Sequence, residues 1–465
     1  MLRRRAFLGA LATGALACRP SRPPLLPGPT RSVIVIGAGI AGLTVARLLQ
    51  AAGVEVVVLE ARDRIGGRIH TIDLAGATID LGAAWIHGRR GNPVAAIADA
   101  HGIATAPHPY QPIALWDAVE GRFADPAEIK AALRRERGFL AALASLRREL
   151  GDSASAQAAI DAHLAELRLP ARADRYARLV LEQYMIELDY SGPSARTALA
   201  LLDEDEFYGY DDHRIVGGTR ALLAPLAQGL DIRLAAPATR ILHDPTEIRV
   251  ETAGGAAFTA DRAIVTVPLG VLQAGAIAFA PALPASKAAA LQRLEMGSLE
   301  KVILRFDRAF WPNVTDAAWL HAGRARGELP LIIDATAAAG APTLLLFHGG
   351  QRAREVLDRH GDPALVASAL AVIEATLGTS APAPIAAHVT RWRSDPWSRG
   401  SYSFPALGQR LADFDALAAP VGDRLLFAGE ATSRAGFGTV HGAVSSALRE
   451  AQRLGVDGSG VPGLA

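Results

Sequence analysis

Hydrophobic positions form their clearest pattern between residues 33 and 60, where two short apolar runs flank a helical segment. Val33–Ile36 is apolar and β-branched, which predicts a buried parallel strand. Residues 43–52 have a helical composition, and Gly53 can cap the end of that helix. Residues 54–59 form a second apolar run. The order strand, helix, strand predicts the first unit of a parallel sheet.

Glycines and one acidic residue occupy the junctions of this unit. Gly37, Gly39 and Gly42 form G-x-G-x-x-G between the first strand and the helix. The first glycine permits a tight turn, the second lets the backbone approach a pyrophosphate, and the third lets the helix pack closely on the strand. Glu60 ends the second strand, where a carboxylate can accept both hydroxyls of a ribose. Since all the parts are in register, the pattern predicts a dinucleotide-binding site.

Other parts of the chain predict short strands separated by long helical tracts. Strand-like segments lie at 71–81, 232–267 and 424–428. Asp125 and Glu128 have the spacing of a capping box that begins a helix. The apolar residues that continue this helix are Ile129, Leu133, Leu140, Leu143 and Leu150. We therefore expect the nucleotide-binding domain to be assembled from separated pieces, with a substrate-binding domain inserted between them.

Residues 60–68 narrow the nucleotide to a flavin. They read E-A-R-x-R-x-G-G-R. A nicotinamide enzyme has no need of a second Gly-Gly-Arg turn here, whereas a tightly held diphosphate does. Arg62 and Arg68 can supply fixed cationic forks to the phosphates; the alternative is a solvated basic loop. The motif resembles the flavin amine oxidase superfamily and its relatives, the carotene desaturases and protoporphyrinogen oxidases, which implies FAD.

Five further segments resemble the amine oxidases, and the polyamine oxidase and histone lysine demethylase branch in particular. They are residues 80–88 with Asn92 and Pro93, 216–218, 296–302, 390–392 with 400–403, and 428–432 with 438–443. These segments occur in family order. The resemblance therefore covers nearly the whole chain.

The resemblance implies an α/β fold, with a Rossmann-like FAD-binding domain of the GR2 type and an inserted α+β substrate-binding domain. We expect the FAD-binding domain to comprise residues 31–105, 215–285 and 385–456. The substrate-binding domain would comprise residues 106–214 and 286–384. Residues 457–465 are expected to form a flexible tail.

The resemblance also implies which residues bind the cofactor. Glu430 follows a buried strand, where its carboxylate can accept ribityl or ribose hydroxyls. Thr439 and Val440 are assigned to the flavin ring edge, at a helix N-terminus whose dipole favours electron density there; the alternative is a helix cap alone. Ser401 stands where mitochondrial monoamine oxidases carry a flavin-linking cysteine, so FAD should be non-covalent. The expected FAD-binding residues are Gly37, Gly39, Gly42, Glu60, Arg62, Gly67, Arg68, Gly82, Ala83, Ala84, Trp85, Ala238, Trp392, Gly429, Glu430, Thr439 and Val440.

Lysine is rare in this chain. Lys130, Lys287 and Lys301 are the only three lysines, against 45 arginines. Lysine differs from arginine because burial can lower its pKa strongly. Lys301 lies between apolar runs in an expected strand, and the resemblance places it under the flavin, holding a water near N5. The alternative is a strand-end lysine that reaches solvent.

The resemblance further implies a substrate cage beside the flavin. Tyr402 corresponds to one wall, and the second, aromatic in some members, is Thr439 here, which leaves one side open and suits a bulkier secondary amine. Trp392 is expected to pack beside Lys301. His87 is expected at the mouth of the pocket. The alternatives are ordinary core packing for both aromatic residues and a merely satisfied histidine for His87.

Acidic residues and the single cysteine complete the candidate chemistry. Glu187 and Asp189 could bind a distal ammonium, although acidic residues beside helices are usually solvated. Asp203–Glu206 is expected to be a solvated turn. No spacing of metal ligands occurs, and Cys18 is the only cysteine, so we expect neither a metal site nor a disulfide.

The first 30 residues carry a charge asymmetry. They contain five arginines and no acidic residue, and without them the formal charge of +1 becomes −4, with 43 basic and 47 acidic residues. This charge balance does not suggest a nucleic-acid partner, for which a basic stripe is expected. Residues 4–8 match the R-R-x-F-L core of twin-arginine signals, and the apolar stretch that follows is too short to span a bilayer. The twin-arginine translocase moves folded proteins, which suits a flavoprotein that must bind its cofactor before export.

Cys18 follows Ala15-Leu16-Ala17, a near match to a lipoprotein cleavage box. It is therefore either lipidated or removed with the signal. Residues 20–29 form a proline-rich tether. We expect the mature protein to be periplasmic or lipid-anchored to the membrane surface.

The sequence as a whole predicts an exported FAD-dependent amine oxidase. A polyamine or another primary or secondary amine would give hydride to flavin N5, water would hydrolyse the imine to an aldehyde and an amine, and dioxygen would be reduced to hydrogen peroxide. One alternative is an L-amino-acid oxidase on the same scaffold, which needs an arginine for the substrate carboxylate. Another is a flavin-binding protein without turnover.

Overall fold

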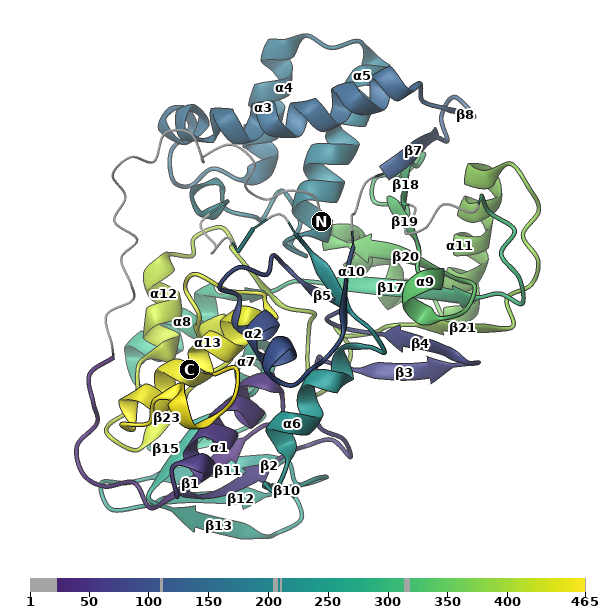
Figure 1. Cartoon of the computed structure of the whole chain (residues 1–465). Helices are drawn as coiled ribbons and strands as arrows, with labels where there is room; N and C mark the ends of the chain where they lie inside the picture. The colour runs from purple at the N-terminus through teal and green to yellow at the C-terminus, as the bar shows by residue number, and fades with distance from the viewer. Residues whose placement is uncertain (1–22, 109–111, 204–207, 210, 313–317, 465) are drawn as a thin grey trace.

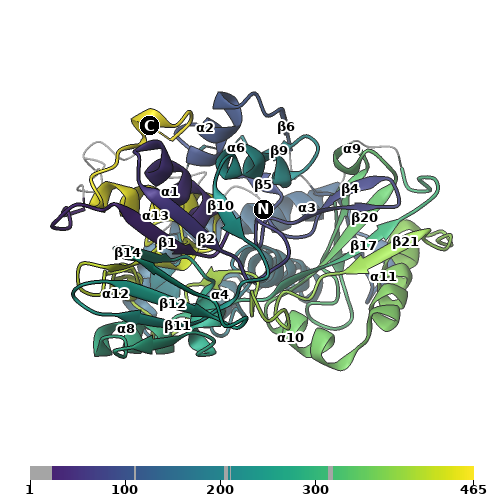
Figure 2. The same ribbon diagram turned by 90° about the horizontal axis from the view of Figure 1, so that it is seen from below.

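The computed structural model describes residues 23–108, 112–203, 208–209, 211–312 and 318–464 (Figure 1). A five-stranded parallel sheet and a seven-stranded mixed sheet organise the chain, and Figure 2 shows the elements around one beside those around the other. The predicted export signal and Cys18 lie outside the described residues, as do residues 204–206 of the predicted acidic turn. No helix in the described ranges combines the length and apolar character that crossing a membrane requires.

The parallel sheet has the strand order β10-β2-β1-β14-β23. Its strands are β10 (Asp231–Arg233), β2 (Glu55–Leu59), β1 (Ser32–Ile36), β14 (Arg262–Val265) and β23 (Leu425–Phe427). Helix α1 (Ile40–Ala51) connects β1 to β2, as the apolar pattern predicts. Segments more than 200 residues apart in sequence are therefore neighbours in this sheet, which confirms that it is assembled from separated pieces.

Side chains of β1 alternate between two apolar cores. Val33 and Val35 pack with α1 and with α13 (Val440–Arg453), whereas Ile34 and Ile36 pack with a four-stranded sheet on the other face. That sheet contains β13 (Ala257–Ala260), β12 (Ile248–Thr252), β11 (Ala238–His243) and β15 (Ala278–Ala280). Because both faces of β1 are covered, an uninterrupted apolar run is the pattern that fits it.

The seven-stranded sheet has the order β21-β17-β20-β19-β18-β7-β8. Its strands are β21 (Ala386–Val389), β17 (Leu299–Arg305), β20 (Thr343–Gly349), β19 (Leu331–Asp334), β18 (Ala318–Ala322), β7 (Pro112–Asp117) and β8 (Arg122–Phe123). Val302 and Leu304 of β17 pack against α10 (Gly350–Arg359) and α11 (Asp362–Leu377), while Ile303 joins the core on the opposite face. Lys301 has the same strand parity as Ile303 and so points to that opposite face.

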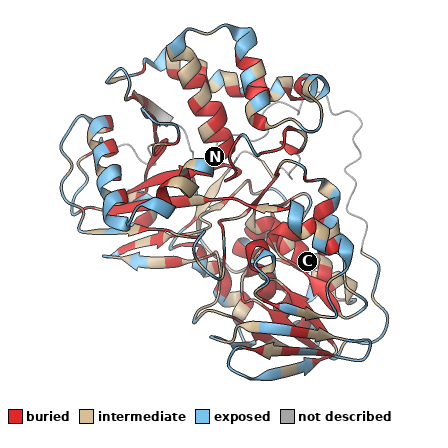
Figure 3. Cartoon of the chain, turned by 180° about the vertical axis from the view of Figure 1, so that it is seen from behind, coloured by how far each residue is buried: buried red, intermediate tan, exposed pale blue. Residues whose placement is uncertain are grey.

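Four helical segments stand against the opposite face of this sheet and beside it. They are α3 (Pro126–Leu150), α4 (Ala156–Leu167), α5 (Ala171–Arg178) and the π-helical η2 (Leu179–Leu188). The capping box at the start of α3 is confirmed, since the Asp125 amide donates to Glu128 Oε2 at 2.9 Å. Figure 3 shows buried residues inside the sheets and exposed residues on the outer helix surfaces.

Shorter elements connect these layers. The strands are β3 (Thr71–Leu74) with β4 (Ala77–Asp80), β5 (Trp85–Ile86) with β9 (His213–Ile215) and β6 (Thr105–Pro107), and β16 (Glu295–Met296) with β22 (Ser403–Phe404). The helices are α2 (Pro93–Ala100), α6 (Leu223–Ala227), α7 (Leu269–Gln273), α8 (Ala285–Arg293), α9 (Thr336–Ala339) and α12 (Leu411–Ala418), with 3-10 turns η3 (Leu199–Leu201), η4 (Thr219–Leu222), η5 (Glu430–Thr432) and η6 (Gly458–Gly460).

The structure differs from the predicted boundaries at three places. β21 pairs with β17, so the seven-stranded sheet extends past the predicted domain boundary at residue 385. α8 packs on α12, so it lies on the other side of the predicted boundary at residue 286. Residues 457–465 were predicted to be a flexible tail, but Val461 and Leu464 are buried in the same core as α1. These two apolar side chains hold the segment against that core, so the prediction of a flexible tail is wrong.

Candidate active site

A cavity of about 420 Å³ lies where the carboxyl ends of β1 and β2 face β17. It brings together all but two of the predicted site residues, which come from segments far apart in the sequence. The predicted residues that line it are Gly37, Gly39, Glu60, Arg62, Gly67, Arg68, Gly82, Ala83, Ala84, Trp85, His87, Asp189, Ala238, Lys301, Trp392, Tyr402, Gly429, Glu430, Thr439 and Val440. Gly42 and Glu187 lie outside the lining.

The turn after β1 forms a backbone cradle that side chains would fill. Gly37 has φ +107°, and a Cβ there would lie 2.7 Å from Thr266 Oγ1. A Cβ on Gly42 would lie 1.9 Å from the Gly37 carbonyl oxygen, which explains the role of Gly42 in helix packing rather than in the lining. At Gly39 the nearest atom to an added Cβ is 4.0 Å away, so its open side is available to a ligand. This arrangement fits a pyrophosphate at the N-terminus of α1.

Glu60 is buried at the end of β2, and two backbone amides orient it. Its carboxylate accepts from the Ala38 amide at 2.7 Å and from the Arg62 amide at 2.8 Å. Each carboxylate oxygen has a second lone pair for a hydroxyl donor. The observed position is compatible with the predicted ribose contact.

Arg62 differs from its prediction. Its guanidinium makes two hydrogen bonds of 2.8 Å to Asp395, and it also donates to Ser398. Burial raises the pKa of Asp395, but the hydrogen bond and charge of Arg62 bring it below its usual value. The Arg62 guanidinium therefore binds a protein carboxylate in two hydrogen bonds. This contact does not give Arg62 the predicted role of binding a phosphate.

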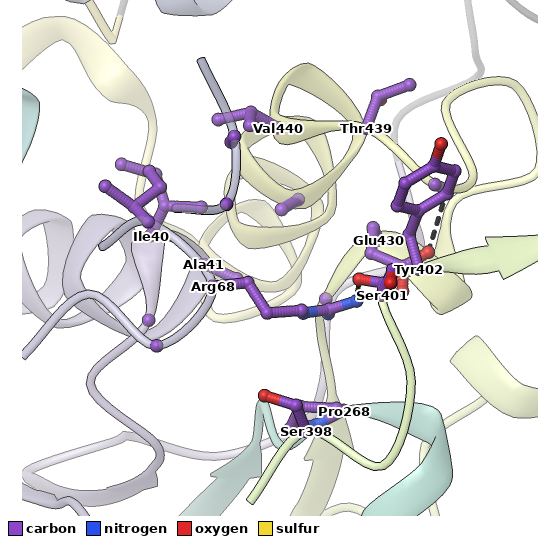
Figure 4. A pocket seen from close by; sticks show the side chains of 18 of the residues that line it. Ile40, Ala41, Arg68, Pro268, Ser398, Ser401, Tyr402, Glu430, Thr439 and Val440 are labelled. Atoms are coloured by element: carbon purple, nitrogen blue, oxygen red, sulfur yellow. Dashed lines mark hydrogen bonds and ion pairs between the residues drawn. The ribbon is translucent and has the colours of Figure 1, made fainter. Parts of the chain in front are cut away.

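Arg68 and Glu430 brace the loops on the far side of the cavity. Arg68 Nη1 donates to Glu430 Oε1 at 2.9 Å and to the Ser401 carbonyl at 3.1 Å (Figure 4). Glu430 also accepts from the Ser403 hydroxyl and from the Gly438 amide. Glu430 was predicted to accept cofactor hydroxyls, but protein donors hold both of its oxygens. Its carboxylate therefore fixes three loops around the cavity.

Lys301 is buried on β17, and its ammonium binds the backbone of residues 80–82. Nζ donates to the Asp80 and Gly82 carbonyls at 2.8 Å each and lies 5.3 Å from the centre of the Trp85 ring. Burial lowers the pKa of Lys301 to about 8, against the opposing effect of nearby carboxylates. The alternative of a lysine that reaches solvent is thus wrong.

Trp392 packs against the Leu81–Gly82 backbone, and the Gly82 carbonyl in turn accepts from Lys301. Its indole Nε1 donates to the Leu81 carbonyl at 3.4 Å, and its side chain is buried. A Cβ on Gly82 would lie 3.2 Å from the Trp392 ring and 1.8 Å from the Arg68 carbonyl oxygen. Glycine at position 82 therefore lets the backbone pass between these groups and reach Lys301.

Tyr402 and Thr439 both line the cavity (Figure 4), and an added Cβ on Gly438, the residue before Thr439, would lie 3.1 Å from Tyr402 Cδ2. The Tyr402 hydroxyl donates to the Leu188 carbonyl at 3.0 Å, where the π-helical segment η2 ends. Thr439 is the N-cap of α13, and its Oγ1 accepts from the Gly442 amide at 2.9 Å. The helix-cap role of Thr439 is confirmed, and its position on the cavity wall agrees with the predicted open side of the cage.

The two acidic residues predicted to bind a substrate ammonium differ in their position relative to the cavity. Asp189 lines the cavity, but Glu187 does not. The Glu187 carboxylate accepts from Arg326 Nη2 at 2.9 Å, and burial raises its pKa while Arg326 opposes this rise. The prediction that Glu187 binds a substrate ammonium is wrong, because its carboxylate binds Arg326 and the residue lies outside the cavity lining.

The structure adds lining residues that the sequence analysis missed. They are His108, Tyr208, Asp212, Phe437 and His441, among others. Tyr208 and His441 form an edge-on pair with ring centres 5.0 Å apart, and Asp212 lies 3.4 Å from His87 Nδ1. Tyr208 and Asp212 belong to no sequence motif, and Asp212 comes beside His87 only through the pairing of β5 with β9.

The fold and the cavity define an α/β protein that holds a dinucleotide against a buried lysine and an aromatic wall. The model of the family "Flavin containing amine oxidoreductase" matches residues 40–455, and the chain belongs to this family. It is a flavin-dependent amine oxidase.

Comparisons with individual proteins agree with this assignment. The chain is 34% identical over 437 residues to polyamine oxidase 2 of Arabidopsis thaliana, which covers 90% of this chain and 87% of that protein. It is 35% identical over 463 residues to lysine-specific histone demethylase 1 homolog 2 of Oryza sativa subsp. japonica, covering 96% of this chain and 60% of that protein. The solved structure of wild-type putrescine oxidase bound to putrescine has a TM-score of 0.76 and 22% identity, covering 91% of this chain and 99% of that one.

FAD is the cofactor that this family and fold indicate, and the glycine cradle fits it. Gly37 and Gly39 would hold its pyrophosphate, Glu60 its adenosine ribose, and Val440 and Lys301 would lie near its ring. Ser401 Oγ exchanges hydrogen bonds of 2.8 Å with the Leu299 backbone, which is consistent with a non-covalent cofactor.

Proposed function

We propose that this protein oxidises a polyamine or another primary or secondary amine, with the carbon beside the nitrogen losing hydride to N5 of bound FAD. The observation that supports this most is the composition of the cavity wall. Asp189 and Asp212 give its substrate side negative charge, and Trp392 and Tyr402 give it aromatic surface. Such a wall suits a cationic or neutral amine with an alkyl chain.

The residues contribute position and desolvation more than acid and base groups. Tyr402 and Trp392 exclude water and limit the orientations of the amine, because each is anchored to a main-chain carbonyl. A restricted orientation of the reacting carbon supplies a large part of the rate of such a reaction. Lys301 supplies a fixed cation inside the water-poor cavity.

The proposed reaction consumes an amine, water and dioxygen, and its atoms and electrons balance. The amine loses two electrons and a proton as hydride and becomes an iminium ion, and water then adds to release an aldehyde and the smaller amine. The flavin supplies the two-electron acceptor when it is bound. Dioxygen takes the two electrons and two protons and leaves as hydrogen peroxide.

The alternative L-amino-acid oxidase needs an arginine to bind the substrate carboxylate in two hydrogen bonds. Arg62 and Arg68 are the arginines in the described part of the lining. Both are engaged, Arg62 by Asp395 and Arg68 by Glu430, and both lie toward the nucleotide end. This observation favours amines without a carboxylate.

The proposal is tested by an anaerobic absorption spectrum of the holoprotein, titrated in turn with spermidine, putrescine, butylamine and an L-amino acid. Bleaching of the flavin bands by an amine supports the proposal and ranks the substrates. Bleaching by the amino acid alone would assign the protein to the alternative oxidase.

We also propose that the two sheets correspond to a Rossmann-like FAD-binding domain of the GR2 type and an inserted substrate-binding domain, and that the protein is exported by the twin-arginine translocase. The export proposal rests on Arg4 and Arg5 in the leader, and periplasmic release or a lipid anchor depends on Cys18. Replacing Arg4 and Arg5 with lysine should retain the protein in the cytoplasm. Replacing Cys18 with serine separates an anchored from a released product by membrane fractionation.

A further inference from the structure

His87 and Asp212 meet because two short strands pair in front of the cavity. β5 and β9 are antiparallel, with Trp85 opposite Arg214 and Ile86 opposite His213. His87 follows β5 and Asp212 precedes β9, and His87 Nδ1 lies 3.4 Å from Asp212 Oδ2.

The Asp212 carboxylate is fixed by the backbone as well. The Gly88 amide donates to Asp212 Oδ1 at 2.9 Å. Gly88 has φ +65°, and a Cβ there would lie 2.4 Å from the carbonyl carbon of Tyr208. The turn therefore depends on glycine, and it presents its amide to Asp212.

Asp212 lines the same cavity as Lys301, further along its wall. Trp85 and His87 are two residues apart on an extended chain, which corresponds to about 7 Å along the cavity wall. The Trp85 ring lies 5.3 Å from Lys301 Nζ, and Trp85, His87 and Asp212 all line the cavity. Asp212 and Lys301 therefore line the same cavity, with Trp85 and His87 between them along its wall.

Asp212 also has the charge that a distal ammonium requires. Burial raises its pKa, but the hydrogen bond and charge of His87 and the Gly88 amide together hold it below its usual value. A carboxylate offers about four lone-pair positions, and His87 and Gly88 use two of them. The Asp212 side chain is 19% exposed, so its remaining positions are reachable from the cavity.

We infer that Asp212, held in place by His87 and Gly88, binds the distal ammonium of a diamine or polyamine while the carbon beside its first nitrogen is oxidised near Lys301. This inference rests on the proposed function and adds the residue that distinguishes polyamines from monoamines. Asp189 is the other carboxylate on this side of the described lining, and it is the competing candidate.

The test compares three variants of the holoprotein, Asp212→Asn, Asp189→Asn and Asp211→Asn, in anaerobic stopped-flow titrations with spermidine and with butylamine. Asp211 is exposed, neighbours Asp212 in sequence and lies outside the lining, so its variant makes the same charge change as a matched control. In Asp212→Asn the Kd for spermidine should rise by about 10- to 100-fold and the Kd for butylamine far less, whereas Asp211→Asn should keep the wild-type values for both amines.

Three results would overturn the inference. They are equal spermidine binding by wild type and Asp212→Asn, a selective loss in Asp189→Asn instead, or an equal loss for butylamine. Flavin content and melting temperature of Asp212→Asn identify a folding defect, and Asp212→Glu should then recover spermidine binding if charge is what matters. If neither spermidine nor putrescine reduces the wild-type flavin, the proposed function fails before this inference is reached.

Discussion

The ammonium of Lys301 donates to the main-chain carbonyl of Gly82 at 2.8 Å, between residues 219 positions apart in sequence. Lys301 belongs to β17 of the seven-stranded sheet, and Gly82 follows the hairpin of β3 and β4. A side chain at position 82 would collide with the Arg68 carbonyl oxygen. The contact fixes a buried cation at the point where the two sheets face the same cavity.

Replacing Lys301 with methionine should slow flavin turnover. Methionine has a similar length but neither charge nor donors, so the carbonyls of Asp80 and Gly82 lose a partner. We expect reoxidation of the reduced holoprotein by dioxygen to slow by about 100-fold, because a preorganised charge is lost from a desolvated site. Stopped-flow mixing of the reduced protein with oxygen measures this rate.

Lys130 provides the matched control for this variant. It is exposed on α3, so Lys130→Met makes the same chemical change away from the cavity. Its reduction and reoxidation rates should equal those of wild type. Unchanged reduction and reoxidation rates in Lys301→Met would remove Lys301 from the catalytic machinery.

The rate of reoxidation should also depend on pH through Lys301. Burial lowers the pKa of Lys301 to about 8, so the ammonium is present below this pH and is lost as the pH rises through it. The rate should therefore fall above pH 8, by roughly tenfold per pH unit once deprotonation dominates. The same measurement on Lys301→Met should show no such decrease, and a decrease that persists would assign the titration to another group.

Local patterns were enough to predict the nucleotide-binding half of the site. The apolar run Val33–Ile36, the spaced glycines and Glu60 are close in sequence, and their geometry follows from the strand and helix that contain them. Lys301 was predictable because lysine is rare in this chain and this one is surrounded by apolar residues. The resemblance to a family supplied the distant partners, such as Tyr402.

Contacts between distant segments explain what could not be predicted. Arg62 finds Asp395 across 333 positions, and no local pattern distinguishes that partner from a phosphate. Asp212 lies beside His87 only because β9 pairs with β5. Glu187 and Asp189 are two residues apart in the sequence, yet only Asp189 reaches the cavity.

Replacing Glu430 with glutamine should weaken FAD retention. The variant loses its ion pair with Arg68 and places an amide near the Arg68, Ser403 and Gly438 donors, so the three loops lose their common acceptor. We expect FAD affinity to fall by about 10- to 100-fold. The ratio of flavin to protein absorbance after gel filtration measures retention. Glu166→Gln on the exposed side of α4 is the control, and full flavin occupancy in Glu430→Gln would contradict this role for the carboxylate.

Lys287 should matter for stability and not for the reaction. Its buried ammonium donates to the carbonyls of Ala416 and Ala419 at 3.1 and 2.7 Å and lies 3.8 Å from the centre of the Phe427 ring, so it closes the C-terminal end of α12 against β23. Lys287→Met removes the donor from the buried Leu417 carbonyl and from the part-buried Ala416 and Ala419 carbonyls, which should cost about 2–4 kcal/mol and lower the melting temperature by several degrees. Anaerobic flavin reduction should stay at the wild-type rate, since Lys287 does not line the cavity. A slower reduction at unchanged melting temperature would contradict this assignment, and the opposite responses of the Lys287 and Lys301 variants would separate a structural from a catalytic buried lysine in one chain.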